Sequence, residues 1–166
     1  MTLYNLILNN YCGGQIVADG EVELSDGTKL RFRTTLIDIK EIGFSYFDGV
    51  NFNVSLSIGV STISVPQNLK DSVSSRPLSP AQLPQEGWET VDIVGAKPAT
   101  LNIKTTSSKG NFEVKIVTEP MMVARNLLYK NILNEPLYIL NTITKYLGKK
   151  LKNDAKRYFN RSKNYS

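Results

Sequence analysis

Apolar and polar residues alternate at the start of the chain. Residues 20–24 place acids on one face of an extended strand and aliphatic side chains on the other, and residues 29–39 continue this pattern. Asp26-Gly27 lies between the two runs, and this dipeptide favours a tight hairpin turn because both residues tolerate positive φ. The pattern therefore predicts an antiparallel hairpin.

Further alternating runs follow along the chain. We predict a short strand over residues 42–46, a turn at Asp48-Gly49, a strand from Val50 to Ile58, and a bulge or turn at Gly59. Strands are also predicted over residues 60–65, 89–94, 99–106 and 111–118. The residues predicted for the core of this part are Phe52, Val54, Leu56, Phe112, Val114 and Ile116. About seven or eight antiparallel strands at close spacing indicate a sandwich or a small barrel.

Residues 66–88 interrupt the alternation with four prolines and several serines. Proline lacks the amide donor that a sheet interior requires, so we expect a long loop here, with one or two helical turns over residues 68–74. Two interpretations stay open: a connection laid over the surface, or an arm that contacts a partner subunit. The residues that would form such an arm are Arg76, Pro77, Pro80 and Pro84.

The pattern changes again near the C-terminus. Glu119-Pro120 predicts the end of the sheet, and residues 121–133 are a connector, either strand or linker. Asn134-Glu135-Pro136 is a typical helix start, and apolar residues then recur every three or four positions. The spacing predicts a basic amphipathic helix over residues 134–162, followed by a tail over residues 163–166. Its apolar stripe comprises Leu137, Leu140, Ile143, Leu147, Leu151, Ala155 and Tyr158.

Charge is concentrated in the same region. The chain carries a net charge of +5, yet residues 145–166 hold eight bases and one acid, so that the preceding part has a net charge of −2. This asymmetry indicates a segment that interacts with an anionic partner. The candidate binding residues are Lys145, Lys149, Lys152, Lys156, Arg157 and Arg161. The alternatives are a solvated outer face, a helix–helix contact and, less favoured without tryptophan on the apolar face, a membrane surface.

Catalytic chemistry has little support in the sequence. The chain has no histidine, its one cysteine is Cys12, and it contains no phosphate-binding glycine loop. Glu21 and Glu23 share one strand face, which is typical of a solvated surface rather than of a catalytic pair. We therefore expect no enzyme, no cofactor, no metal site and no small-molecule substrate. The N-terminal apolar run is short and lacks a basic start, so we expect no signal peptide and no transmembrane segment.

These observations predict a mainly β fold, a sandwich or small barrel over residues 1–120, with one long C-terminal amphipathic α-helix. The function expected is that of a non-catalytic interaction or assembly module with protein subunits as partners and nucleic acid as a further one. A structural or accessory subunit of a viral, phage or other nucleoprotein assembly fits this description, in the cytoplasm or a virion. The alternative is a free, sequence-independent nucleic-acid-binding domain of the OB-like barrel type.

Overall fold

The computed structural model describes residues 11–44 and 50–151, and within them the alternating runs around Asp26-Gly27 form the predicted hairpin. Strand β2 (Val17–Leu24) pairs with β3 (Lys29–Phe44), with Val22 opposite Leu30. Gly27 adopts a φ of 90°, and the Thr28 amide donates a 2.8 Å hydrogen bond to the Asp26 carboxylate. The turn therefore has the backbone conformation for which an Asp-Gly pair is suited.

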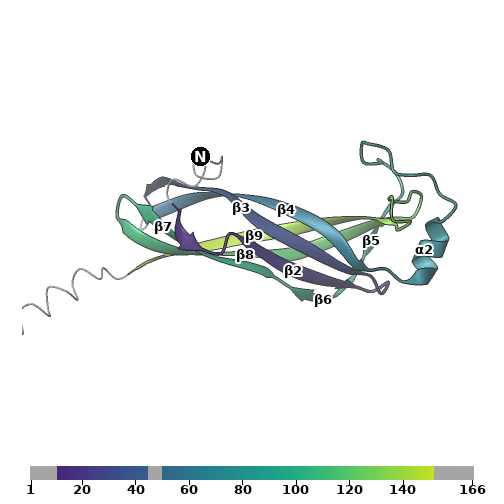
Figure 1. Ribbon diagram of the computed structural model, residues 1–166, viewed down its shortest axis with the longest axis horizontal. Coiled ribbons are helices and arrows are strands. Elements are labelled where there is room, and N and C mark those ends of the chain that lie inside the picture. The colour runs from purple at the N-terminus through teal and green to yellow at the C-terminus, as the bar shows by residue number, and fades with distance from the viewer. Residues whose placement is uncertain (1–10, 45–49, 152–166) are drawn as a thin grey trace, which may run out of the picture.

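Two antiparallel sheets face each other in an elongated sandwich (Figure 1). The first sheet has the order β1-β7-β8, with β5 on the same edge of β8 as β7 and β9 on the opposite edge. Its strands are β1 (Tyr11–Gly14), β5 (Trp88–Val91), β7 (Ala99–Ser107), β8 (Gly110–Asn126) and β9 (Leu137–Lys150). The second sheet has the order β4-β3-β2-β6, with β4 (Val50–Ser64) and β6 (Ile93–Lys97) as its edges. The mainly β prediction is confirmed, and the two separate sheets identify a sandwich.

The chain crosses between the sheets on one side of the sandwich. Strand β5 belongs to the first sheet, β6 to the second and β7 again to the first. The crossing at Asp92 is fixed by its carbonyl, which accepts a 2.8 Å hydrogen bond from the Ser25 amide in the β2–β3 turn. These crossovers close the β5–β6–β7 side, here called the closed side.

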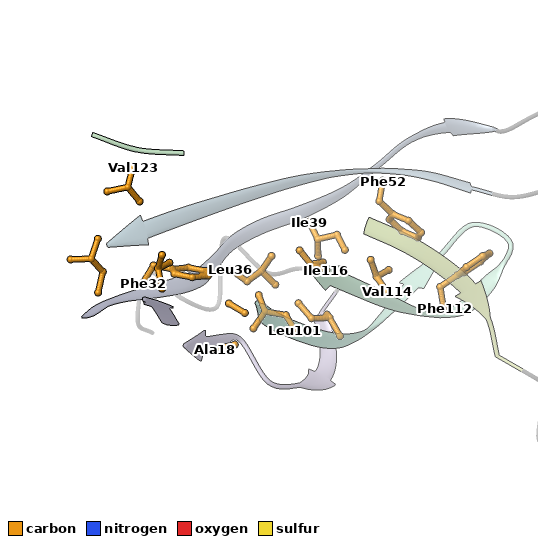
Figure 2. Packing of buried hydrophobic residues seen from close by; sticks show 14 of the residues in the cluster. Ala18, Phe32, Leu36, Ile39, Phe52, Leu101, Phe112, Val114, Ile116 and Val123 are labelled. Atoms are coloured by element: carbon orange, nitrogen blue, oxygen red, sulfur yellow. The ribbon is translucent and has the colours of Figure 1, made fainter. Parts of the chain in front are cut away.

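The core fills the space between the sheets, and Figure 2 shows its side chains pointing into that space. Phe52 and Phe112 meet edge to face, with ring centroids 5.6 Å apart. Of the predicted core residues, Phe52, Phe112, Val114 and Ile116 are buried, whereas Val54 and Leu56 are partly buried against the cluster. The prediction is thus confirmed for β8 and only partly met for β4.

The predicted C-terminal helix is wrong, because the described part of that segment contains strand β9, which pairs with β8 along its whole length. β-Branched residues such as Ile139, Thr142 and Ile143, together with Gly148, weaken a helix and suit a sheet. Steps of three or four residues also mix the two faces of a strand. Leu137, Ile143 and Leu147 consequently lie on the outer face of the sheet, and the Leu147 side chain is 75% exposed. The one described helix is α2 (Gln67–Val73), close to the helical turns predicted over residues 68–74.

Two local predictions are also corrected. Gly59 makes no turn, since β4 continues through it opposite Arg33. The first sheet does not end at Glu119-Pro120, because β8 passes Pro120 with a register shift before Met122 and continues to Asn126. A bulge of this kind lets an extended strand accommodate a residue that has no amide donor.

Candidate functional site: the open side of the sandwich

Strands β4 and β9 form the side of the sandwich opposite the crossovers, here called the open side. Each pairs with only one described strand, β4 with β3 and β9 with β8, and no backbone hydrogen bond joins the two across the described residues. They approach each other at one end, where a Cβ added to Gly148 would lie 3.3 Å from the Phe52 ring. The two edges leave a row of backbone donors and acceptors without a strand partner.

Exposure of the inner face of β4 rises along the strand. Phe52 is 4% exposed, whereas Ile58 is 36% and Val60 is 40% exposed. All three alternate with outward polar residues, so each points toward the interior of the sandwich. Their unequal burial arises because no described strand covers the space between β4 and β9 at this end.

An apolar groove of about 360 Å³ lies beside Val60 on the open side. It extends between the end of β4, the start of β9, the loop that follows α2 and the loop that precedes β9. Its lining residues are Leu30, Val60, Ser61, Thr62, Leu83, Asn131, Leu133, Pro136, Leu137 and Tyr138. A concave, mostly apolar lining with a few polar groups is typical of a binding site.

One wall of the groove is the turn that leads into β9. The Asn131 side-chain oxygen accepts hydrogen bonds from the amides of Leu133, at 2.9 Å, and Glu135, at 3.0 Å. Asn134 adopts a left-handed φ of 56°, which asparagine tolerates better than most residues. The residues predicted to start a helix therefore form a turn, because the Asn131 side chain competes with helical hydrogen bonding.

The same turn is attached to the edge of β4. The buried Glu135 carboxylate accepts a 2.6 Å hydrogen bond from the Thr62 hydroxyl and a 3.5 Å contact from the Asn131 amide group. This contact covers the end of β4 at Thr62, whereas the turn does not cover the residues of β4 that come before Thr62. The groove therefore has a fixed wall.

A polar cluster lies under Tyr138 at the groove floor. The Tyr138 hydroxyl is 2.8 Å from the Thr28 hydroxyl and donates to Asp26 at 3.0 Å, and the Arg125 guanidinium lies 3.0 Å from Asp26. Arg125 also contacts Glu89 at 2.7 Å. These contacts join the β2–β3 turn to β5, β8 and β9, so the floor is tied to both sheets.

The pKa values in this cluster follow from burial and hydrogen bonding. Burial opposes ionisation of Asp26, but hydrogen bonds from Thr28, Tyr138 and Arg125 outweigh it and lower the pKa of Asp26. Burial, together with the nearby Asp26 charge, raises the pKa of Tyr138. Asp26 is therefore an anion and Tyr138 a neutral donor at neutral pH, which suits a structural role.

Large apolar side chains are also exposed on the loops around the groove. Ile132 is 88% exposed, and Leu78, Leu83 and Leu133 are each more than half exposed. Single exposed apolar residues are common, but a group of them around an apolar groove indicates an interaction surface.

The predicted basic site is only partly described. Lys145 and Lys149 are exposed on the outer face of β9, because a spacing of four residues also places two side chains on one face of a strand. Lys104 and Lys115 share that face of the first sheet, where Glu113 and Glu119 intervene. The Lys145 ammonium lies 3.4 Å from Glu119. Lys152, Lys156, Arg157 and Arg161 lie outside the described residues.

The predicted arm lies at the end of the sandwich beside α2 and is attached to its neighbours (Figure 1). The Pro77 carbonyl accepts a 3.0 Å hydrogen bond from the Lys130 amide, and the Pro84 carbonyl accepts a 2.7 Å hydrogen bond from the Trp88 indole. Arg76 donates its amide to Val73, and the Pro80 side of the loop is exposed. The arm residues are therefore not gathered with the lysines into one site.

Sequence reasoning missed the residues that form the groove. Leu137 and Tyr138 fall within the predicted helix, Leu133 within the predicted connector, and Val60 within a predicted strand. The cluster of β-branched residues in 139–144 was the signal for a strand. Nothing in the sequence indicated that β4 and β9 would leave a gap beside Val60, because the gap depends on the pairing of distant strands.

The described residues hold no group of three or more cysteine and acidic side chains that could bind a metal ion. Nor does any helix in the described ranges have the length and hydropathy to cross a membrane. No protein-family model matches the chain, and neither a curated protein nor a solved structure shows significant similarity to it.

Proposed function

We propose that the protein is a non-catalytic interaction module that docks a protein partner through the open side of its sandwich. The observation that carries this proposal is the exposure of inner-face apolar residues of β4, Ile58 and Val60, beside the groove and an unpaired strand edge. A partner bound there would remove apolar surface from water and satisfy the edge backbone groups together. This fits a structural or accessory subunit of a larger assembly, including a viral or phage one.

A rigid floor and wall support the proposal. Tyr138 is held by Thr28 and Asp26, and the wall is held by Asn131 and Glu135. A site whose shape is fixed before binding loses less conformational entropy when the partner arrives.

A photo-crosslinking amino acid at position 60 tests the function. The matched control is the same amino acid at position 102, which lies on β7 and points to the outer face of the first sheet. Irradiation in cells that make the full assembly should yield covalent protein adducts from position 60 and few or none from position 102. Equal yields at both positions, or none at either, would contradict the proposal.

A second candidate partner is an anionic polymer such as nucleic acid, favoured by the lysines on the outer face of the first sheet, Lys104, Lys115, Lys145 and Lys149. Lysine acts as a point charge, so binding should be nearly independent of sequence and should weaken with salt. Four phosphate contacts predict a slope of log affinity against log salt of about −3.5 on duplex DNA. Replacing the four lysines with glutamine should flatten the slope without unfolding the protein. Undetectable binding of the native chain at low salt would remove this candidate.

A further inference from the structure

The strand edges of the two sheets differ in how they are protected. Strand β1 has four residues, two of them glycine, and β6 has five residues with Lys97 at its end and Pro98 immediately after it. Strand β9 is long but carries Lys145, Lys149 and Lys150. Short length, proline and lysine are the features that prevent a strand edge from pairing with another chain.

Strand β4 has none of these features. It runs for 15 residues, from Val50 to Ser64, without a charged residue or a proline. Its outer face carries asparagine, serine and glycine up to Ser61, and its inner face is apolar up to Val60. Among the edges described, β4 is therefore the one that is both long and free of protection.

The ends of β4 are covered by the chain itself. Phe52 lies against Gly148 of β9, and the Thr62 hydroxyl bonds to Glu135. Residues 54–60 remain between these contacts, and Ser57 is their midpoint. A twofold contact uses the same surface on both subunits. A twofold axis between two antiparallel copies of this stretch would therefore pass through its midpoint.

We propose that β4 pairs with β4 of a second copy of this chain, antiparallel and centred at Ser57. In this register Leu56 faces Ile58 of the other copy, Val54 faces Val60, and Ser55 faces Gly59. Every apolar inner residue meets another apolar residue, and no charge meets a like charge. The added strand covers the exposed Ile58 and Val60 and joins the two β4-containing sheets into one.

This inference rests on the proposed function and names its partner. A contact of one short strand pair is small for a protein interface, so we expect a reversible, concentration-dependent dimer. Sedimentation equilibrium of the full chain should show a mass rising from 18.5 kDa toward twice that value with concentration.

A charge exchange at Ser57 tests the geometry. Ser57 points outward opposite Thr35 of β3, so a new charge meets no charged cross-strand partner within its own chain. Ser57→Lys and Ser57→Asp should each weaken the dimer about fivefold or more, because each places like charges across the axis. Mixing the two variants should restore dimers that contain one chain of each. Asn141→Lys on β9 is the matched control and should leave the dimer unchanged.

Circular dichroism and urea midpoints establish that each variant is folded. A native chain that stays monomeric at all concentrations overturns the inference, and so does a dimer that Ser57→Lys leaves intact. In either case, position-60 adducts with another protein would leave the proposed function standing. If the dimer depends on Ser57, the second copy covers Val60 and position 60 must give adducts. A Ser57-dependent dimer without adducts from position 60 would therefore contradict the inference.

Discussion

The inner faces of β7, on the closed side, and of β4, on the open side, are both mainly apolar but are buried to different extents. On the closed side, Leu101 and Ile103 of β7 are completely buried, whereas on the open side Ile58 and Val60 of β4 are more than one third exposed. The difference arises from the covering strands. The crossovers through β5, β6 and β7 close one side, whereas on the other side no backbone hydrogen bond joins the edges of β4 and β9 within residues 11–44 and 50–151. Burial here is therefore set by topology as much as by hydropathy.

The largest expected difference between the two sides is in the stability lost when an apolar side chain is truncated. Leu101→Ala, in the fully buried part of β7, should lower the free energy of unfolding by about 2–5 kcal/mol, because it leaves a cavity that neighbours cannot fill. Val60→Ala, on the open side, should cost less than about 1 kcal/mol, since much of its side chain already contacts water. Urea titrations of both variants at a low protein concentration give this comparison. Equal losses would show that the open side is as well packed as the closed side.

The polar cluster around Asp26 should give the next largest effect on the free energy of unfolding. Asp26→Asn should cost about 1–3 kcal/mol at pH 7, because it weakens the hydrogen bonds of a buried charge to Arg125 and Tyr138. The pKa of Asp26 is lowered in the folded state, so its contribution is complete above the unfolded-state pKa of about 3.9 and disappears as pH falls through the folded-state pKa. The difference between native and variant proteins should therefore shrink below about pH 4.

Urea midpoints between pH 7 and pH 2.5 measure this dependence. Asp19→Asn is the control, because Asp19 forms an exposed ion pair with Arg33 on the outer face of the second sheet. Asp19→Asn should lower the free energy of unfolding at pH 7 by less than Asp26→Asn does. A difference between the native and Asp26→Asn proteins that stayed constant down to pH 2.5 would show that the Asp26 charge does not stabilise the fold.

The smallest expected effect concerns two buried threonines. The hydroxyls of Thr34 and Thr118 have no hydrogen-bond partner within the described structure, whereas the equally buried Thr28 bonds to Tyr138. Thr34→Val should raise the free energy of unfolding by up to about 1 kcal/mol, because it removes an unsatisfied buried hydroxyl at constant shape. Thr28→Val should lower it. Thermal unfolding of both proteins measures the signs, and a loss in Thr34→Val would indicate that its hydroxyl has a partner in solution.

Local chemistry predicted the regions that form hairpins. Asp26-Gly27 joins two alternating runs and this hairpin is present, and the strands predicted over residues 99–106 and 111–118 pair with each other. The helix over residues 67–73 could also be predicted, because it follows Pro66 in a stretch without alternation. In these regions the interactions that decide the structure lie within a few residues of one another.

The C-terminal segment and the groove could not be predicted in this way. Residues 137–150 have apolar spacings that are compatible with a helix, and their β-branched residues favour a strand, so the pairing with β8 decides between the two. Asn134 is favourable both as a helix cap and in a left-handed turn, and the Asn131 side chain decides between them. The groove requires the positions of β4, β9 and two loops at once, which no local pattern encodes.

The sheet order has a consequence for the order in which the chain folds. Strands β2, β3 and β4 pair with sequence neighbours and can assemble as soon as they have been synthesised. Strand β1 can pair only after residues 103–105 have been synthesised, and the second edge of β2 can pair only after β6 has been synthesised. Pairing between distant segments is slow, because the intervening loop must first be closed. During this delay the edge of β2 that later pairs with β6 is exposed in addition to the β4 edge, so crowded synthesis of this protein should promote premature association of neighbouring copies.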